Sequence, residues 1–206
     1  MTPAVFLSAS VPDPRRDRRY YDTADLTAIR DAVRALVTVV LPKARLVWGG
    51  HPAITPLVRL IAEDMGITGA DKICLFQSAY FSGRMPKDNA AFESVVKVRR
   101  VKDDLEASLD LMRRQMIASE RFAAGVFIGG MEGVETEYKM FLEKHPHAKA
   151  LPIASTGGAA LLIFRRRHSL PTELKDDLAY PSLFRRLLGF QMHRRQRKTG
   201  GTQNGT

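Results

Sequence analysis

The chain has 206 residues, 45% hydrophobic and 26% charged, a composition that allows one globular domain with a sizeable core. A single cysteine excludes an internal disulfide framework and any multi-cysteine zinc site, so Cys74, in the apolar run KICLF, is expected to be a reduced core thiol. No stretch reaches the roughly 18 apolar residues of a membrane helix, and the N-terminus lacks the order of a signal peptide. We therefore expect a cytoplasmic protein without a membrane partner.

The net charge of +10 arises from 32 Lys and Arg against 22 Asp and Glu, and it indicates an anionic partner. Part of this excess lies at the C-terminal end, which contains Arg194, Arg195, Arg197 and Lys198 and no acid. We predict one domain over residues 1–190 and a flexible basic and polar tail over residues 191–206. A solvated tail is the expectation, and contact with nucleic acid or lipid is the alternative.

The apolar pattern alternates between short runs and helical periodicity, which is typical of strands and helices around a parallel sheet. Strands are predicted at residues 4–10, 44–50, 72–81, 123–130 and 148–156. Helices are predicted at residues 25–40, 53–65, 103–119 and 132–144, with closing helices within 157–166 and 174–190. The sequence therefore predicts an α/β fold, a Rossmann-like three-layer sandwich with a mostly parallel central sheet of about five or more strands.

Two segments have no clear periodic pattern. Residues 83–100 are expected to form a loop, because Gly83, Pro86 and Asn89 interrupt them, although FESVVKV fits either a short strand or a helix. The basic and aromatic stretch RRDRRYYD, residues 15–22, is expected to be a solvated loop, and covering a ligand or stacking on a base is the alternative.

Small and polar residues follow four of the predicted strands, at the edge where an open parallel sheet binds ligands. Adjacent glycines allow positive φ and close backbone approach, while the next helix directs free N–H groups to the same place, so these turns suit a phosphate group. Glycine used only for turning is the alternative, and His51 either donates to a phosphate or only forms part of a turn. The candidate ligand-binding residues are Ser8, Ser10, Gly49, Gly50, His51, Gly129, Gly130, Gly133, Thr156 and Gly157.

Three glutamates follow the glycines in VFIGGMEGVETEY, residues 126–138. Acids in the first turn of a helix are favoured by its dipole, which is a sufficient structural reason for them. Glu137 differs because it lies one turn beyond Gly133 and can look back toward the glycine turn. A carboxylate there can bind sugar hydroxyls, or act as a base or nucleophile at a sugar carbon. Glu137 is therefore a candidate ligand-binding residue and, in an enzyme, a candidate catalytic residue.

The segment IGGMEGVETEY resembles the PGGxGTxxE signature of the SLOG superfamily, which joins the Lonely guy phosphoribohydrolases, the DNA-processing protein A group and ligand-sensing SLOG domains. LMRRQM resembles the arginine motif of the preceding helix in Lonely guy enzymes, and WGGHPAITPLV resembles the family's second-strand glycine motif. The resemblance covers roughly residues 4–160. It implies a Rossmann-like fold, no cofactor, and Arg113 or Arg114 near a phosphate, with a catalytic role beside Glu137 only in an enzyme.

This sequence departs from the enzyme pattern at Ile128, Val134 and Gln115, which replace proline, threonine and lysine, and the glycine loop has one extra residue. It is more similar to SLOG members of bacterial conflict systems, which are thought to sense nucleotide-derived signals. The leading hypothesis is a dimeric sensor of a nucleotide or ADP-ribose-type ligand that acts through an effector protein. The alternatives are a nucleoside monophosphate phosphoribohydrolase and a nucleic-acid-binding protein.

No metal site is predicted from the sequence. His145 and His147 flank Pro146 in a predicted loop without carboxylates at ligand spacing.

Overall fold

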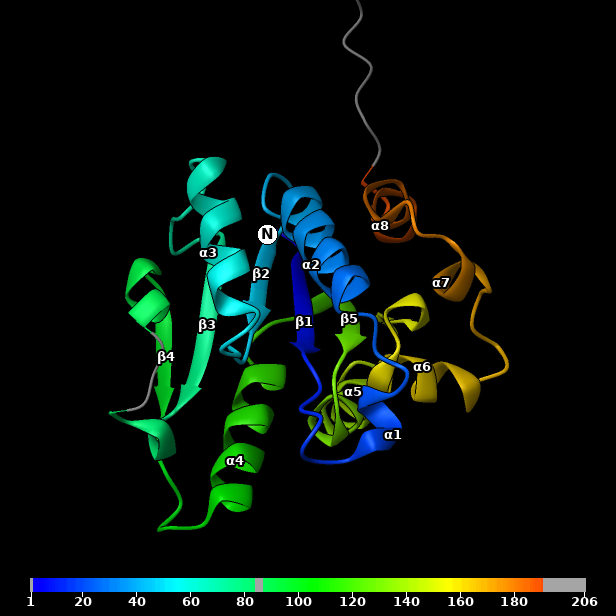
Figure 1. Cartoon of the computed structure of the whole chain (residues 1–206). Coiled ribbons are helices and arrows are strands. Elements are labelled where there is room, and N and C mark those ends of the chain that lie inside the picture. Colours follow the sequence, from blue (N-terminus) through cyan, green and yellow to red (C-terminus); the bar gives the residue numbers. More distant parts are fainter. Residues whose placement is uncertain (1, 84–86, 191–206) are drawn as a thin grey trace, which may run out of the picture.

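A six-stranded sheet in which every pairing is parallel forms the centre of the protein in the computed structural model, which describes residues 2–83 and 87–190 (Figure 1). The strands are β1 (Ala4–Ser10), β2 (Arg45–Trp48), β3 (Ile73–Ser78), β4 (Val95–Val98), β5 (Phe122–Gly129) and β6 (Lys149–Ile153). Their spatial order is β4-β3-β2-β1-β5-β6. The predicted α/β Rossmann-like class is confirmed, whereas the prediction for residues 191–206 lies outside the described residues.

The strand order reverses between β1 and β5. The chain builds outward from β1 through β2 and β3 to β4, and then returns to add β5 on the other side of β1. Ser8 is in register with Phe127 and Ser10 with Gly129, so the two strands end together. The connections diverge at such a switch point, which leaves a crevice beyond the carboxyl ends of the strands.

Helices cover both faces of the sheet, because successive strand residues point to opposite sides. Val5 and Leu7 of β1 pack on one side, whereas Ala4 and Phe6 pack on the other. The first side carries α2 (Leu26–Val40), α3 (Thr55–Asp64), α7 (Glu173–Asp176) and α8 (Tyr180–Leu188). The second carries α1 (Arg18–Tyr21), α4 (Leu105–Ala118), α5 (Glu132–Lys144) and α6 (Gly158–Arg165). In Figure 1 the strand arrows end near α1, α4 and α5.

An aromatic cluster fixes α5 on the sheet. Phe141 stacks on Phe6 of β1 with ring centroids 5.5 Å apart, and Tyr138 contacts Phe127 of β5 edge to face at 4.9 Å. Gly125 makes room for Phe141, because a Cβ at this position would lie 2.9 Å from the ring. Aromatic pairs at these separations add to the burial of apolar area, so the rotation of α5, and with it the direction of Glu137, is set by this cluster.

Two predictions about local structure were wrong. Residues 83–100 were expected to form a loop, but Val95–Val98 form β4 beside β3, and Lys87–Ala91 form a short 3₁₀ helix. The stretch 15–22 was expected to be a solvated loop, and its four arginines are exposed, but residues 18–21 form α1 and Tyr20 is fully buried in the second core layer. Cys74 is a buried free thiol, as predicted. None of the helices in residues 2–83 and 87–190 is long and apolar enough to span a membrane.

Glycines bring the end of β1, the turn after β5 and the start of α6 into direct backbone contact. The Gly130 N–H donates to the Ser10 carbonyl at 2.8 Å, and the Ala159 N–H donates to the Gly130 carbonyl at 2.9 Å. Gly157 has φ of 70° and ψ of −156°, and a Cβ there would lie 1.8 Å from the Thr23 carbonyl oxygen. Only glycine fits both this backbone region and this contact.

Gly157→Ala is therefore expected to lower the free energy of unfolding by roughly 3 kcal/mol or more, because it combines backbone strain with a collision against main chain. Gly66→Ala is the matched control, since Gly66 also has positive φ, 64°, but open space around it. Backbone strain alone predicts a loss of about 1–2 kcal/mol there. Equal losses in urea unfolding of the two variants would contradict the close contact at Gly157.

Candidate functional site

A cavity of about 590 Å³ opens at the carboxyl ends of β1, β2 and β3, and α4 and the first turns of α5 form its sides. Its size lies within the range of sites for small molecules, roughly 300–1,000 Å³. The cavity brings together a large part of the predicted set, namely Ser8, Ser10, Gly49, Gly50, His51, Arg113, Gly133 and Glu137. These residues converge although they come from four separate parts of the chain.

The remaining predicted residues lie outside the cavity lining. Gly129 and Gly130 form the backbone junction behind it, and Gly157 packs on Thr23. The buried Thr156 hydroxyl accepts a hydrogen bond from the Gly129 N–H at 2.8 Å and donates one to the Ile153 carbonyl at 2.6 Å. These positions support the turn structurally.

Only one of the two candidate arginines reaches the cavity. Arg113 lines it from α4, whereas Arg114 lies on the exposed side of the helix and pairs with Asp110 at 2.7 Å. Helix geometry explains the difference, because Met112 and Met116 are buried against the sheet. Arg113 therefore points along the sheet edge toward α5, whereas Arg114 points to solvent.

Arg113 and Glu137 face each other in a largely buried pair. Their Nε and Oε1 atoms are 3.5 Å apart, and the side chains are only 13% and 15% exposed. Among the described residues, Arg113 Nε and the neighbouring Ser8 Oγ are buried without a hydrogen-bond partner. Burial raises the pKa of Glu137, and Ser8 and Arg113 oppose that rise. Buried polar atoms normally have partners, so this group has hydrogen-bonding capacity for a ligand.

The N-terminus of α5 is open toward the same group. Met131 precedes the helix without a side-chain cap, and the first intrahelical bond from the N-terminus is donated by Val134 to Met131 at 3.0 Å. The N–H groups of Glu132 and Gly133 therefore have no acceptor within the helix. A Cβ on Gly133 would lie 3.1 Å from Arg113 Nη2, so the guanidinium lies directly beside this end of the helix. Helix N–H groups and an arginine together form a suitable anion site.

His51 lines the cavity from the turn after β2. The amide of Gln77 donates to the Gly49 carbonyl at 2.9 Å and holds this turn, in which Gly50 has φ of 71°. Burial lowers the pKa of His51, and its Nδ1 accepts from the Ala53 N–H at 3.2 Å. The neutral ring therefore carries its proton on Nε2, which is its remaining donor.

An apolar wall completes the cavity and was not identified from the sequence. Leu105, Leu109 and Met112 of α4 line it together with Phe81 after β3. In the sequence these α4 residues form the single apolar stripe of a predicted helix, which is the pattern of an ordinary core face. No signal in that pattern separates the residues that meet the sheet from those that meet the cavity.

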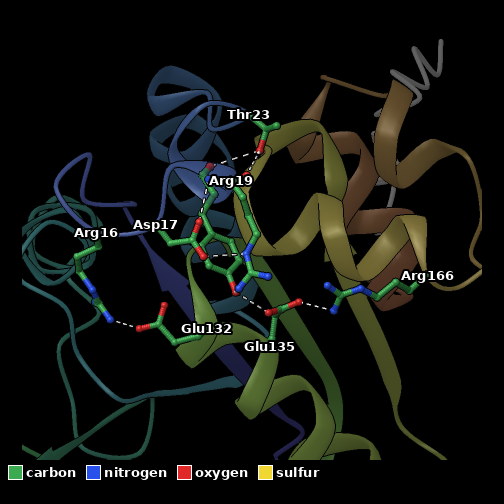
Figure 2. Close-up of polar contacts among 8 residues, drawn as sticks. Arg16, Asp17, Arg19, Thr23, Glu132, Glu135 and Arg166 are labelled. Atoms are coloured by element: carbon green, nitrogen blue, oxygen red, sulfur yellow. Dashed lines mark hydrogen bonds and ion pairs between the residues drawn. The ribbon is translucent and has the colours of Figure 1, made fainter.

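The segment between β1 and α2 is anchored across α5 and α6 (Figure 2). Tyr20 Oη donates to Glu135 Oε2 at 2.6 Å, and Arg166 Nη1 contacts Glu135 Oε1 at 2.6 Å. Burial and the Glu135 carboxylate raise the pKa of Tyr20 to about 12. Arg16 forms an ion pair with Glu132, and both side chains line the cavity. The segment thus forms part of the site.

Within the part of the chain that the structure describes, no three or more His, Cys, Asp or Glu side chains are grouped to hold a metal ion.

The parallel sheet and its switch point define a Rossmann-like α/β domain. A family model described as the SLOG cluster3 family matches residues 19–188, so the chain belongs to that family, and the predicted SLOG relationship is confirmed. The X-ray structure of TM1055, a Northeast Structural Genomics Consortium target, has a TM-score of 0.52 and 16% identity over 79% of this chain and 81% of that chain, which shows a shared fold. No curated protein matches the chain.

Tyr20→Phe tests the anchor on α5. Loss of a hydrogen bond to a charged group is expected to lower the free energy of unfolding by about 1.5 kcal/mol. Tyr21→Phe is the neighbouring control, because within the described residues the Tyr21 hydroxyl has no hydrogen bond, and its effect is expected to stay within about 0.5 kcal/mol. Urea unfolding compares the variants, and equal effects would show that the Tyr20 hydroxyl contributes nothing.

Glu137→Gln tests the electrostatics of the buried pair. Because the pKa of Glu137 in the folded protein is raised above the ordinary 4.5, this group favours folding most below that pH, and its contribution is lost as pH rises through the raised pKa. The stability of the wild type relative to Glu137→Gln is therefore expected to fall as the pH rises above the ordinary pKa of 4.5, as measured by urea unfolding. A difference that rises with pH would show that Arg113 holds the pKa below its usual value instead.

Proposed function

We propose that this protein binds a nucleotide-derived ligand, a nucleoside monophosphate or an ADP-ribose-type molecule, in the cavity at the switch point, and that it serves as a sensor in a bacterial defence or signalling system. The observation that carries the proposal is the convergence of Arg113, Glu137, Ser8 and the open N-terminus of α5 on one cavity. The resemblance to conflict-system SLOG members supports the sensor role, a homodimer and an effector protein as partner.

Each chemical part of a nucleotide has a matching part of the cavity. A phosphate fits between Arg113 and the free N–H groups of α5, with His51 Nε2 as a further donor. Ribose hydroxyls fit Ser8, whose Oγ is buried without a hydrogen-bond partner among the described residues, and the neighbouring carboxyl group of Glu137. The apolar wall of Leu105, Leu109 and Met112 suits the face of a base. A single ligand thus accounts for the polar and the apolar lining.

Cleavage of an N-glycosidic bond is the second candidate, and the position of Glu137 favours it. This carboxyl group lies in the cavity, largely buried, four residues after Gly133 as in the signature that the sequence resembles. A carboxylate there can stabilise or attack a sugar carbon as positive charge develops on it. The nucleic-acid alternative rests on the positive net charge and the basic tail, and it predicts steeply salt-dependent binding that weakens when residues 190–206 are removed.

A thermal-shift screen against AMP, NAD, ADP-ribose, cyclic ADP-ribose and other nucleoside monophosphates tests the proposal, with chromatography of each mixture for released base. A ligand at a hundredfold excess over its Kd stabilises the fold by about 2.7 kcal/mol, which raises Tm by roughly 5–10 °C for a domain of this size. A shift without released base supports a sensor. Released base that disappears in Glu137→Gln shows an enzyme, and no shift with any compound contradicts ligand binding in this class.

The neighbouring arginines provide a matched pair of variants. Arg113→Gln is expected to weaken the binding of a phosphate-bearing ligand by about tenfold or more, because a hydrogen bond to a charged group is lost. Arg114→Gln removes the same charge one residue away, on the exposed face, and is expected to change binding by less than about twofold. Titration calorimetry measures both, and equal weakening would place the ligand elsewhere.

A further inference from the structure

Arg16 and Glu132 form an ion pair (Figure 2), and this pair lies at the rim of the cavity. Both side chains line the cavity, yet they are 58% and 51% exposed, so they stand where the cavity meets solvent. Glu132 is also the first residue of α5, and its carboxylate is therefore at the helix end that is open to an anion. The rim thus already contains a carboxylate beside the helix end to which a ligand phosphate would bind.

Anchoring of the following residues keeps Arg16 within reach of α5. Asp17 caps α1 by accepting a hydrogen bond from the Arg19 N–H at 3.0 Å, and the next turn buries Tyr20, which bonds to Glu135. Arg166 holds the same glutamate from α6. Arg16 comes directly before this fixed turn, so its side chain is held close to the opening of the cavity.

Three of the four acids that line the cavity have an arginine partner. Arg113 faces Glu137, Arg16 faces Glu132, and Asp13 pairs with Arg15. Glu106, at the start of α4, lines the cavity without an ion-pair partner among the described residues. An anion at the N-terminus of α5 therefore meets a like charge on Glu132. It also meets Arg16, whose guanidinium is already paired with Glu132. Close like charges disfavour binding, and rim charges act in this way on selectivity.

We propose that Glu132 is an internal competitor for Arg16: an anionic ligand group must displace this carboxylate, and the pair sets the charge selectivity of the site. The inference rests on the proposed function and adds two specificity-determining residues to it. Arg16 contributes to binding only when the ligand has an anionic group to receive the guanidinium. An uncharged nucleoside leaves the ion pair intact and gains nothing from its removal.

Titration calorimetry with AMP and adenosine, which differ by one phosphate, tests this competition on the full chain. Glu132→Gln is expected to tighten AMP binding about two- to fivefold and to leave adenosine unchanged, as removal of an exposed ion-pair competitor predicts. Arg16→Gln is expected to weaken AMP binding by a similar factor. In the double variant the gain from Glu132→Gln should vanish, because coupled residues are not additive.

Two control variants separate competition from a general change of charge. Glu106→Gln removes one negative charge from the cavity without releasing Arg16, and Arg15→Gln removes a positive charge beside Arg16 from a side chain that does not line the cavity. Both are expected to change AMP affinity less than their counterparts do. An equal gain from Glu106→Gln, or a Glu132→Gln gain that persists without Arg16, would overturn the competition.

The results also separate this inference from the proposed function. If AMP binds the wild type and Glu132→Gln equally well, the inference fails and ligand binding stands. If neither AMP nor adenosine binds the wild type or Glu132→Gln, the assignment of a nucleoside monophosphate to this cavity fails, and the inference fails with it.

Discussion

Close backbone packing around Gly130 is the constraint on which the site depends. Its N–H group is bonded to the end of β1 through Ser10, and its carbonyl is bonded to the start of α6 through Ala159. A Cβ at Gly158 would lie 2.7 Å from the same carbonyl oxygen, so three chain segments meet where no side chain fits. This contact brings α5 to its starting point beside the end of β1. The orientation of Glu137 toward Ser8 and Arg113 follows from it.

Most of the fold could be predicted from the sequence, because most strands are buried apolar runs and the long helices have clear boundaries. The strand at residues 4–10 and the helix at 132–144 have the predicted bounds, and the glycine-rich strand ends were correctly expected at one edge of a parallel sheet. β4 was missed because Val95–Val98 are few and mostly half-exposed at the sheet edge, where periodicity is weakest. Tyr20 was missed because its burial depends on α5, more than a hundred residues away.

The candidate site was harder to predict, because residues with the same sequence pattern have different surroundings in the folded protein. Gly50 and Gly157 both follow strands and both have positive φ, yet the first stands at the cavity and the second packs on Thr23. Arg113 and Arg114 differ by one position on α4, and only the burial of Met112 and Met116 decides which of them turns inward. Net charge misleads in the same way: this basic chain has a cavity lined by four acids, Asp13, Glu106, Glu132 and Glu137, and by two arginines.

The described residues that line the cavity end at Glu137, although the fold continues through β6, α6, α7 and α8. The last quarter of the domain therefore supports the site without lining the cavity. It supplies the edge strand β6, the hydrogen bond from Ala159 to Gly130 and the ion pair of Arg166 with Glu135. Such a division separates two kinds of evolutionary change. Substitutions on the cavity-facing side of α4 can change which ligands bind while the fold stays the same. Substitutions after Glu137 are limited chiefly by the need to fold.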